Sequence, residues 1–270
     1  MLTAGCSKFL DTGLDTDMTG DIINNNRHTL WPLAHAMYTP MQNGFTVLDN
    51  NFFAAASDEA EPTYESGAAF ILNNGILNQD NVTWVTGIYR QYYEGIRACN
   101  FFIDHADRYG DDILKKDRDT IRDAVNYARD KRNLAWFKAE AHVARAYYYS
   151  ELIQVFGGVP IVKEVFSSGT KPAPAPQKSY DEVVEYIVGE IDWCLDDLQE
   201  NWLTHSDNLT SEIGRFDKKS ALAIKSRVLL HAASPLHNPS GDVTKWERAA
   251  KAARDVIELM SYTMPPDRDY

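Results

Sequence analysis

The sequence has few cysteines and no long apolar run. Its three cysteines, at positions 6, 99 and 194, fit neither a disulfide framework nor the spacing of a zinc or redox motif. No window approaches the roughly 18 uncharged apolar residues from which a membrane-spanning helix is inferred. What remains is a composition typical of a globular protein, with 44% hydrophobic and 24% charged residues. A chain of 270 residues with this hydrophobic content can build a core without disulfides.

A basic surface is also missing. Asp and Glu together number 39 against 27 for Lys and Arg, so the formal net charge is -12. The densest basic stretch, 115–132, is interrupted by aspartates, which is typical of a solvated helix surface. Because nucleic acids are bound mainly through Lys and Arg, we expect no nucleic-acid partner.

Sequence patterns of known catalytic and metal sites are absent or incomplete. There is no G-x-S-x-G nucleophile motif and no glycine-rich phosphate loop, and the histidines show no pair at metal-ligand spacing. Asp11-Thr12-Gly13 resembles the aspartic protease tripeptide, but that fold needs a second copy, which the sequence lacks. The stretch 15–26 begins like a calcium-binding loop, yet Asn26 stands where a bidentate Glu is required.

One acidic cluster leaves an enzymatic alternative open. Asp58, Glu59 and Glu61 could supply the two carboxylates of a glycosidase, which flank a scissile bond about 5–10 Å apart. Acids crowded so closely along the chain seldom reach that geometry. We therefore expect a protein that is not an enzyme and that needs no metal or cofactor.

Apolar periodicity predicts a mostly α-helical fold. Val85, Ile88, Tyr92 and Ile96 recur at spacings of three and four, which places them on one face of a helix. Cys99 continues this face, and Cys194 lies in another predicted helix, so both are expected to be small buried hydrophobic residues. Further helices are predicted over 133–156, 180–198, 217–234 and 246–260. In the last of these, the apolar face is expected to contain Trp246, Ala250, Ala253, Ile257 and Met260.

Several helix ends are marked by the residues around them. The pairs Ser179 with Glu182 and Thr244 with Glu247 predict capping boxes, in which a hydroxyl and a carboxylate satisfy free backbone amides. Gly157, Gly158 and Pro160 predict the end of the long helix before them. A short extended piece is expected over 159–165.

The region 44–81 is irregular and mixes aromatic residues with acids and asparagines. It contains Phe45, Phe52, Phe53, Tyr64 and Phe70 without a helical period. Long irregular segments between helices often form binding surfaces. The alternative is that these aromatic side chains fill the helical core.

Cys6 stands apart from the other two cysteines. It follows Leu2-Thr3-Ala4-Gly5, which resembles the cleavage box of a bacterial lipoprotein. Thr3 stands where the usual box has Leu, and the five residues before Cys6 do not include the basic and apolar regions of a signal peptide. In such a box the cysteine bears the lipid anchor, and the polar residues up to 26 would form a tether. The alternative is an incidental exposed cysteine.

Several stretches, taken in chain order, are similar to one known family. They are Cys6-Ser7-Lys8-Phe9-Leu10-Asp11, Trp84 to Asn100, Lys138 to Tyr149 with Phe156-Gly157-Gly158-Val159-Pro160, Gly214-Arg215-Phe216 with Ala221 to Leu230 and Ser234-Pro235, and finally Trp246, Ala249 and Ala250. Together they resemble the SusD/RagB family of outer-membrane nutrient-binding lipoproteins. The chain departs from that family at His142, where the family usually has Arg or a hydrophobic residue.

The resemblance implies a scaffold of tetratricopeptide-like helix pairs with irregular loops, a SusD-like α-α superhelix. Residues 1–26 would hold the lipid-anchor site and tether, and 27–270 would form the N-terminal helical domain. Because family members are commonly about twice this length, the C-terminal half is expected to be missing.

The resemblance also implies a function and partners. A lipid-anchored protein on the outer face of the outer membrane would bind an oligosaccharide, or alternatively a peptide, and deliver it to a TonB-dependent SusC-like transporter. A surface glycosidase and a helical-repeat adaptor that binds only proteins are weaker alternatives. Aromatic and amide groups mix just before the first long helix, so the expected ligand contacts are Asp58, Tyr64, Asn78, Asn81 and Trp84.

Overall fold

The computed structural model describes residues 27–44, 48, 51–81, 83–165, 175–202 and 212–260. Cys6 and the expected tether lie outside these residues, as does Phe45. For residues 27–29, 83 and 84 the backbone alone is described.

The described part of the chain is built from helices. It contains two short 3-10 turns, η2 (Phe53–Ala56) and η3 (Leu195–Asp197), and the α-helices α2 (Arg27–Ala36), α3 (Gly67–Asn73), α4 (Thr83–Asp117), α5 (Ala124–Phe156), α6 (Tyr180–Cys194), α7 (Lys218–Ala233) and α8 (Val243–Met260). Within these residues β pairing is limited to isolated bridges, one of which joins Pro160 to Gln177. The prediction of a mostly α-helical fold is therefore confirmed.

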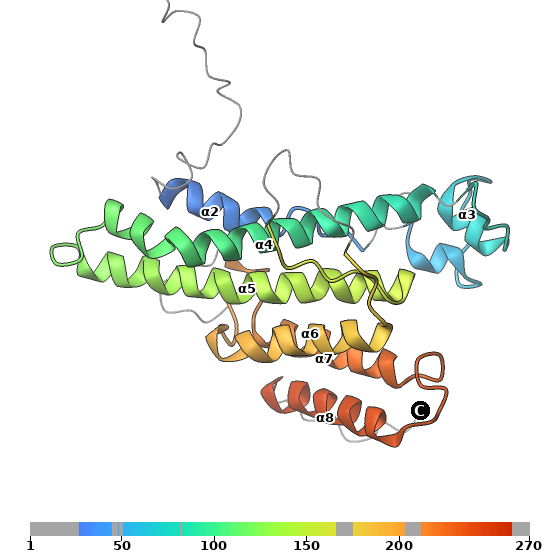
Figure 1. Cartoon of the computed structure of the whole chain (residues 1–270). Helices are drawn as coiled ribbons and strands as arrows, with labels where there is room; N and C mark the ends of the chain where they lie inside the picture. Colours follow the sequence, from blue (N-terminus) through green and yellow to red (C-terminus); the bar gives the residue numbers. More distant parts are fainter. Residues whose placement is uncertain are drawn as a thin grey trace, which may run out of the picture.

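The helices stack in chain order. The long helices α4 and α5 form an antiparallel hairpin, α6 packs on the opposite side of α5, and α7 with α8 continues the stack (Figure 1). The short helix α2 packs against α4. This order is typical of a helical repeat, in which each pair buries its apolar face only against its neighbours.

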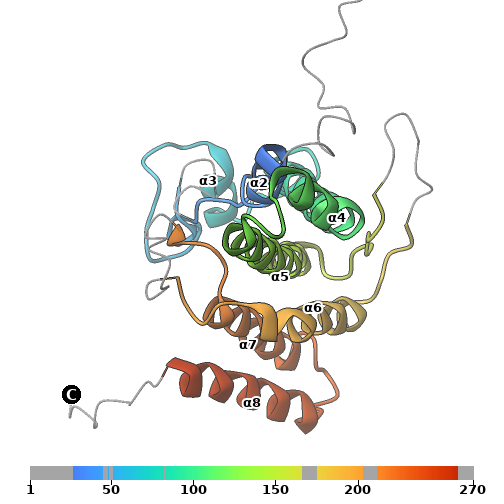
Figure 2. The same cartoon turned by 90° about the vertical axis from the view of Figure 1, so that its left-hand side faces the viewer.

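Two irregular segments lie on opposite sides of this stack. Figure 2 shows α3 and the chain around it on one side of α4 and α5, and the extended chain after α5 on the other side. That extended chain is held by the helices beneath it, because the Tyr93 hydroxyl donates to the Pro160 carbonyl at 2.6 Å and the Asn100 amide donates to the Val162 carbonyl at 2.9 Å.

The hairpin of α4 and α5 contains most of the large buried side chains. Tyr148 on α5 is fully buried and donates a hydrogen bond to the Met37 carbonyl at 2.6 Å. Its ring lies directly against Gly95 of α4, where an added Cβ would fall 2.5 Å from ring carbons. Gly95 therefore allows the two long helices to approach closely.

Cys99 and Cys194 are both buried, as predicted, and burial raises the pKa of each thiol to about 12.

The helix ends agree in part with the sequence. Ser179 and Glu182 form the predicted capping box of α6. Thr244 was predicted to cap α8, but the cap is Asp242, whose carboxylate accepts from the Thr244 amide at 2.9 Å and from its hydroxyl at 2.8 Å. An Asp carboxylate is a strong N-cap and also favours the positive end of the helix, so α8 begins earlier than expected.

Two short helices were not expected. The region 44–81 contains α3 and the turn η2, so it is not irregular throughout. The helix α2 includes Pro32. Proline is unfavourable inside a helix because it lacks the backbone N–H that would form a helical hydrogen bond. Its Leu30, Ala34 and Met37 neighbours are fully buried, and this packing outweighs the lost hydrogen bond.

The apolar residues of α8 are also placed differently from the prediction. Trp246, Ile257 and Met260 were expected to face the core, but they are 45%, 49% and 53% exposed. The buried positions are Ala249 and Ala252, because small residues allow α8 to lie close to α7.

The most deeply buried charge belongs to Glu140 on α5. Its carboxylate is fully buried and accepts from the Arg215 guanidinium at 2.5–3.1 Å and from the Tyr38 hydroxyl at 2.6 Å. Arg215 stacks on Phe137 and Trp202, with its guanidinium carbon 3.8 and 3.9 Å from the ring centres. Burial raises the pKa of Glu140 to about 7, and the Arg215 guanidinium opposes this shift. The pair thus joins α5 to the chain just before α7.

Removing one member of this pair should destabilise the protein far more than removing both. Glu140→Ala removes the fully buried partner of Arg215 and leaves its charge with Glu212 alone, whose side chain is 23% exposed. We expect this change to cost about 3–5 kcal/mol of unfolding free energy. The double variant Glu140→Leu with Arg215→Met should recover most of this loss, because no buried charge remains. Urea unfolding followed by circular dichroism measures both. Equal losses in the single and double variants would contradict this account.

Candidate functional site

A hollow of functional size lies where the segment before α3 meets the helix stack. It has a volume of about 460 Å³, which is within the range of about 300–1,000 Å³ for small-molecule sites. We call it the aromatic pocket, and define it by its lining residues Gln42, Gly44, Phe53, Ile88, Tyr92, Tyr147, Glu151, Gln154, Val155 and Arg227.

One part of the aromatic pocket is apolar. Phe53 comes from η2, Tyr92 from α4 and Tyr147 from α5. The Phe53 side chain is 61% exposed and has little core contact to explain its position. Aromatic faces of this kind stack on the apolar face of a sugar ring or on other flat apolar groups. Tyr92 is buried in the core, so the stacking surface open to a solute is formed by Phe53 and the half-buried Tyr147.

The other part is polar. Arg227 of α7 donates to the Glu151 carboxylate of α5, and its second contact is the Ser150 hydroxyl at 3.4 Å. Gln154 donates to the Ser150 carbonyl at 3.0 Å. Elsewhere in the lining, the Tyr92 hydroxyl donates to the Gln42 carboxamide oxygen at 3.2 Å. The pocket thus combines rings with carboxamide, carboxylate and guanidinium groups.

The two tyrosines of the pocket stay uncharged. Burial raises the pKa of Tyr147 to about 12, and the Glu151 carboxylate adds to this effect. Burial and Glu151 raise the pKa of Tyr92 in the same direction. Both hydroxyls therefore remain neutral at physiological pH and can donate as well as accept hydrogen bonds.

The residues expected to contact ligand lie near the same end of the stack. Figure 1 shows α3 beside the start of α4 and the end of α5. Asp58 lines a shallow hollow with Glu59, Glu61, Asn73 and Asn74, and it does not line the aromatic pocket.

The remaining expected contacts are more dispersed. Tyr64 is 80% exposed and free to meet a solute. Trp84 lies in the first turn of α4, and its side chain is outside the described atoms.

Asn78 and Asn81 stabilise the turn before α4 through side-chain hydrogen bonds. The Asn81 carboxamide accepts from the Asn78 amide at 2.7 Å and donates to the Ile76 carbonyl at 2.8 Å. The Asn78 side chain accepts from the Asp80 amide at 2.9 Å. These contacts hold the turn, and they leave each carboxamide with part of its hydrogen-bonding capacity for a ligand.

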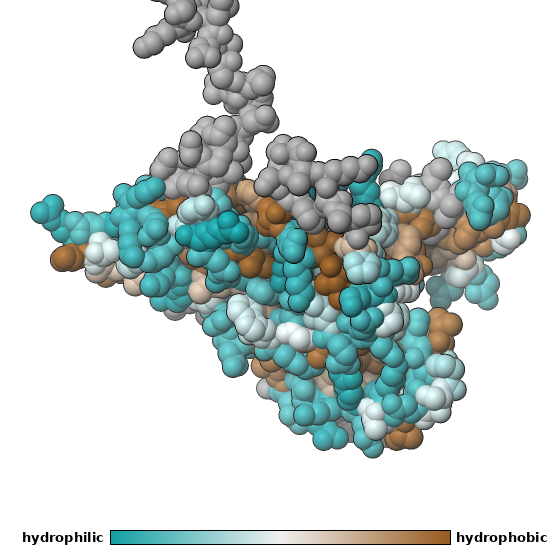
Figure 3. Space-filling model, viewed as in Figure 1, coloured by the Kyte–Doolittle hydropathy of each residue, from teal (hydrophilic) through white to brown (hydrophobic). Residues whose placement is uncertain are grey.

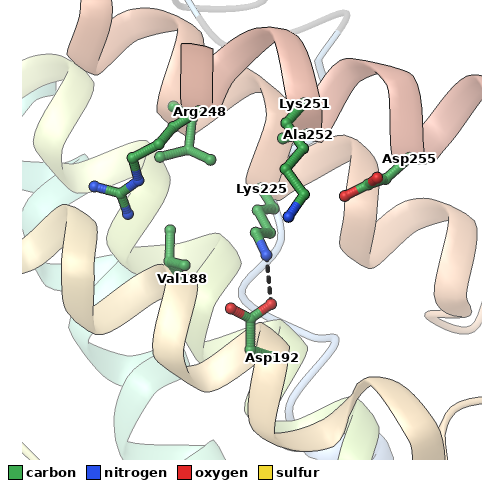
Figure 4. A pocket seen from close by; sticks show the side chains of 8 residues that line it. Val188, Asp192, Lys225, Arg248, Lys251, Ala252 and Asp255 are labelled. Atoms are coloured by element: carbon green, nitrogen blue, oxygen red, sulfur yellow. Dashed lines mark hydrogen bonds and ion pairs between the residues drawn. The ribbon is translucent and has the colours of Figure 1, made fainter. Parts of the chain in front are cut away.

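A second hollow, of about 220 Å³, lies between α6, α7 and α8. Figure 4 shows Lys225 reaching Asp192 across it, at 2.5 Å, while Lys251 lines another side. Arg248 on its edge is paired with Glu185. Lys225, Asp192 and Arg248 thus each form an ion pair between two helices. We interpret this hollow as an interface between helices that is held by ion pairs.

Other kinds of site find little support in the described residues. No helix there combines the length and apolarity needed to cross a membrane. Nor do three or more His, Cys, Asp or Glu side chains in that part of the chain come together as they would around a metal ion. On the face seen in Figure 3, hydrophilic residues predominate over the lower helices.

Comparison with known proteins now identifies the family. A family model described as starch-binding and associating with the outer membrane, SusD-like, matches residues 8–230. This chain belongs to the SusD-like family. No curated protein matches it.

Solved SusD-like structures share the fold. A SusD-like protein from Bacteroides fragilis superposes with a TM-score of 0.64 at 18% identity, covering 91% of this chain and 40% of that one. A SusD homologue from Bacteroides thetaiotaomicron gives 0.63 at 22%, covering 89% and 42%. A laminarin-binding SusD-like protein gives 0.61 at 21%, covering 86% and 44%. This SusD-like chain thus spans less than half the length of these three structures.

Several pocket residues of this SusD-like chain were missed as site candidates. Tyr147 and Arg227 belong to stretches used to recognise the family, but helical periodicity alone gave them no functional meaning. Phe53 had been noted only as an aromatic of the irregular region. A signal was present in Glu151 and Gln154, which are polar residues in the last turns of a mostly buried helix.

The structure separates exposed candidates from those that hold the fold. Tyr64→Ala should change the unfolding free energy by no more than about 0.5 kcal/mol, because an exposed side chain makes few contacts. Asn81→Ala removes two hydrogen bonds of the turn and should cost about 0.5–1.5 kcal/mol. Urea denaturation of each variant beside the wild type measures the difference. A larger loss for Tyr64→Ala than for Asn81→Ala would contradict this assignment.

Proposed function

We propose that this SusD-like chain captures an oligosaccharide at the bacterial cell surface and binds it in the aromatic pocket. The observation that supports this most is the composition of that pocket, in which the exposed Phe53 ring and the half-buried Tyr147 ring lie beside carboxamide and charged groups. Sugar recognition needs this combination, since rings stack on the apolar face of the sugar while polar groups pair with hydroxyls.

The family supports the same ligand class. Its description includes starch binding, and one structure with the same fold is named as laminarin-binding. Asp58, Tyr64, Asn78, Asn81 and Trp84 remain proposed contacts, for those parts of a longer glycan that extend beyond the pocket.

Binding without catalysis fits the pocket better than hydrolysis. Glycosidases generally use two carboxyl groups across the scissile bond. Among the described residues that line the aromatic pocket, Glu151 is the one carboxylate, and Arg227 holds it in an ion pair. We therefore propose a non-enzymatic role.

The proposed role includes delivery. We propose that the protein is attached to the outer membrane by a lipid on Cys6 and passes its glycan to a TonB-dependent SusC-like transporter. Affinities between micromolar and millimolar, about -8 to -4 kcal/mol, would suffice for capture and release. The family's description as associating with the outer membrane supports this location.

Glycan binding can be tested with matched phenylalanine variants. Calorimetric titration with laminarin and starch oligosaccharides should detect binding by the wild-type chain. Phe53→Ala should weaken it about five- to tenfold, because it removes a stacking surface worth roughly 1 kcal/mol.

Phe52→Ala is the control, since Phe52 is similarly exposed but does not line the pocket. Equal effects of the two substitutions would place the glycan elsewhere. Release of shorter sugars from the oligosaccharides by the wild type would contradict the non-enzymatic role.

A further inference from the structure

The aromatic pocket contains one charge of each sign. Of its lining residues, only Glu151 and Arg227 are charged. They belong to different helices, α5 and α7, and their side chains are partly exposed, 21% for Glu151 and 42% for Arg227. A ligand in the pocket could therefore contact both side chains. Because each is also partly buried, water screens their charges only in part.

The hydrogen bonds of this pair leave donors and an acceptor available. Arg227 uses Nη2 for both of its contacts, to Glu151 and to Ser150. Glu151 receives Arg227 and a long contact from Gln154, at 3.5 Å, on the same oxygen, Oε1. Within the described part of the chain, Glu151 Oε2 and Arg227 Nε and Nη1 have no hydrogen-bond partner. Neighbouring hydroxyls of a sugar could donate to the carboxylate and accept from the guanidinium.

This arrangement is unfavourable for an acidic sugar. The carboxylate or sulfate of such a ligand could reach Arg227 only close to the Glu151 carboxylate, because Glu151 already occupies the guanidinium. The negative charge of the ligand and that of the Glu151 carboxylate would then repel each other. A neutral sugar with adjacent hydroxyls meets no such repulsion.

Resting on the proposed glycan binding, we propose that the Glu151–Arg227 pair makes the aromatic pocket selective for neutral glycans, with Glu151 as the residue that rejects acidic ones. The pair would bind adjacent hydroxyls of a neutral pyranose, while glycans bearing uronate or sulfate groups would be excluded.

The electrostatics of the pocket agree with this selectivity. Burial is the main cause of the raised pKa of both Tyr92 and Tyr147. Among the charged residues, Glu151 raises these pKa values more than Arg227 lowers them. Glu151 therefore affects the two hydroxyls more than Arg227 does. The net charge of -12 for the whole chain acts in the same direction.

The test uses two ligands with the same backbone: a neutral glucan oligosaccharide, and the same oligosaccharide with its primary alcohols oxidised to negatively charged carboxylates. In calorimetric titrations of the wild-type chain, the neutral ligand should bind at least about tenfold more tightly. Raising the salt concentration should reduce this preference, because salt screens the repulsion.

Glu151→Gln keeps the size and the hydrogen-bonding capacity of the side chain and removes its charge. It should strengthen binding of the oxidised ligand at least about fivefold and change binding of the neutral ligand less than threefold. Glu247→Gln on α8 is the control, since it removes an exposed charge that does not line the pocket. It should leave the preference unchanged.

The outcomes separate this inference from the proposed function. Binding of the neutral ligand with no preference over the oxidised one, or a preference that Glu151→Gln leaves intact, would overturn the selectivity and leave glycan binding in place. An equal gain for the oxidised ligand in Glu247→Gln would assign the effect to overall charge. Failure of both ligands to bind the wild type would overturn the proposed function, and the selectivity with it.

Discussion

The burial of α5 on more than one side is the constraint on which the rest of the structure depends. Its buried residues are not confined to one stripe, and they include Trp136, Phe137, Tyr148 and Tyr149. A helix that is apolar around much of its circumference must be covered by several neighbours. Helix α4 covers one side and α6 the other, so the order of the stack follows from this single helix.

Buried polar groups on α5 then fix how its neighbours are aligned. Glu140 binds Arg215 from the chain before α7, and Arg145 binds Glu190 of α6 and Asn100 of α4. A buried charge without its partner is costly, whereas apolar side chains tolerate small shifts between helices. These pairs therefore favour one register among several that hydrophobic packing would allow.

The same alignment forms the aromatic pocket. Tyr147, Glu151 and Gln154 follow one face of α5 near its end, at spacings of three and four. Tyr92 of α4 and Arg227 of α7 are brought to them from either side, and Phe53 completes the wall. The pocket is thus a product of the helix stack, and its chemistry depends on the register that the buried ion pairs set.

The sequence by itself determined the helices from α4 onward, several of their ends and the burial of Cys99 and Cys194, because periodicity and capping are local properties of the chain. The start of α5 was predicted at 133, but the helix begins at Ala124. It did not reveal α2 or α3, nor the outward position of Trp246 on α8. The pocket was decided only by the tertiary structure, since its residues lie between positions 42 and 227 of the chain. Stripes of apolar residues show that a helix packs, but which helix covers it depends on the three-dimensional arrangement of all the others.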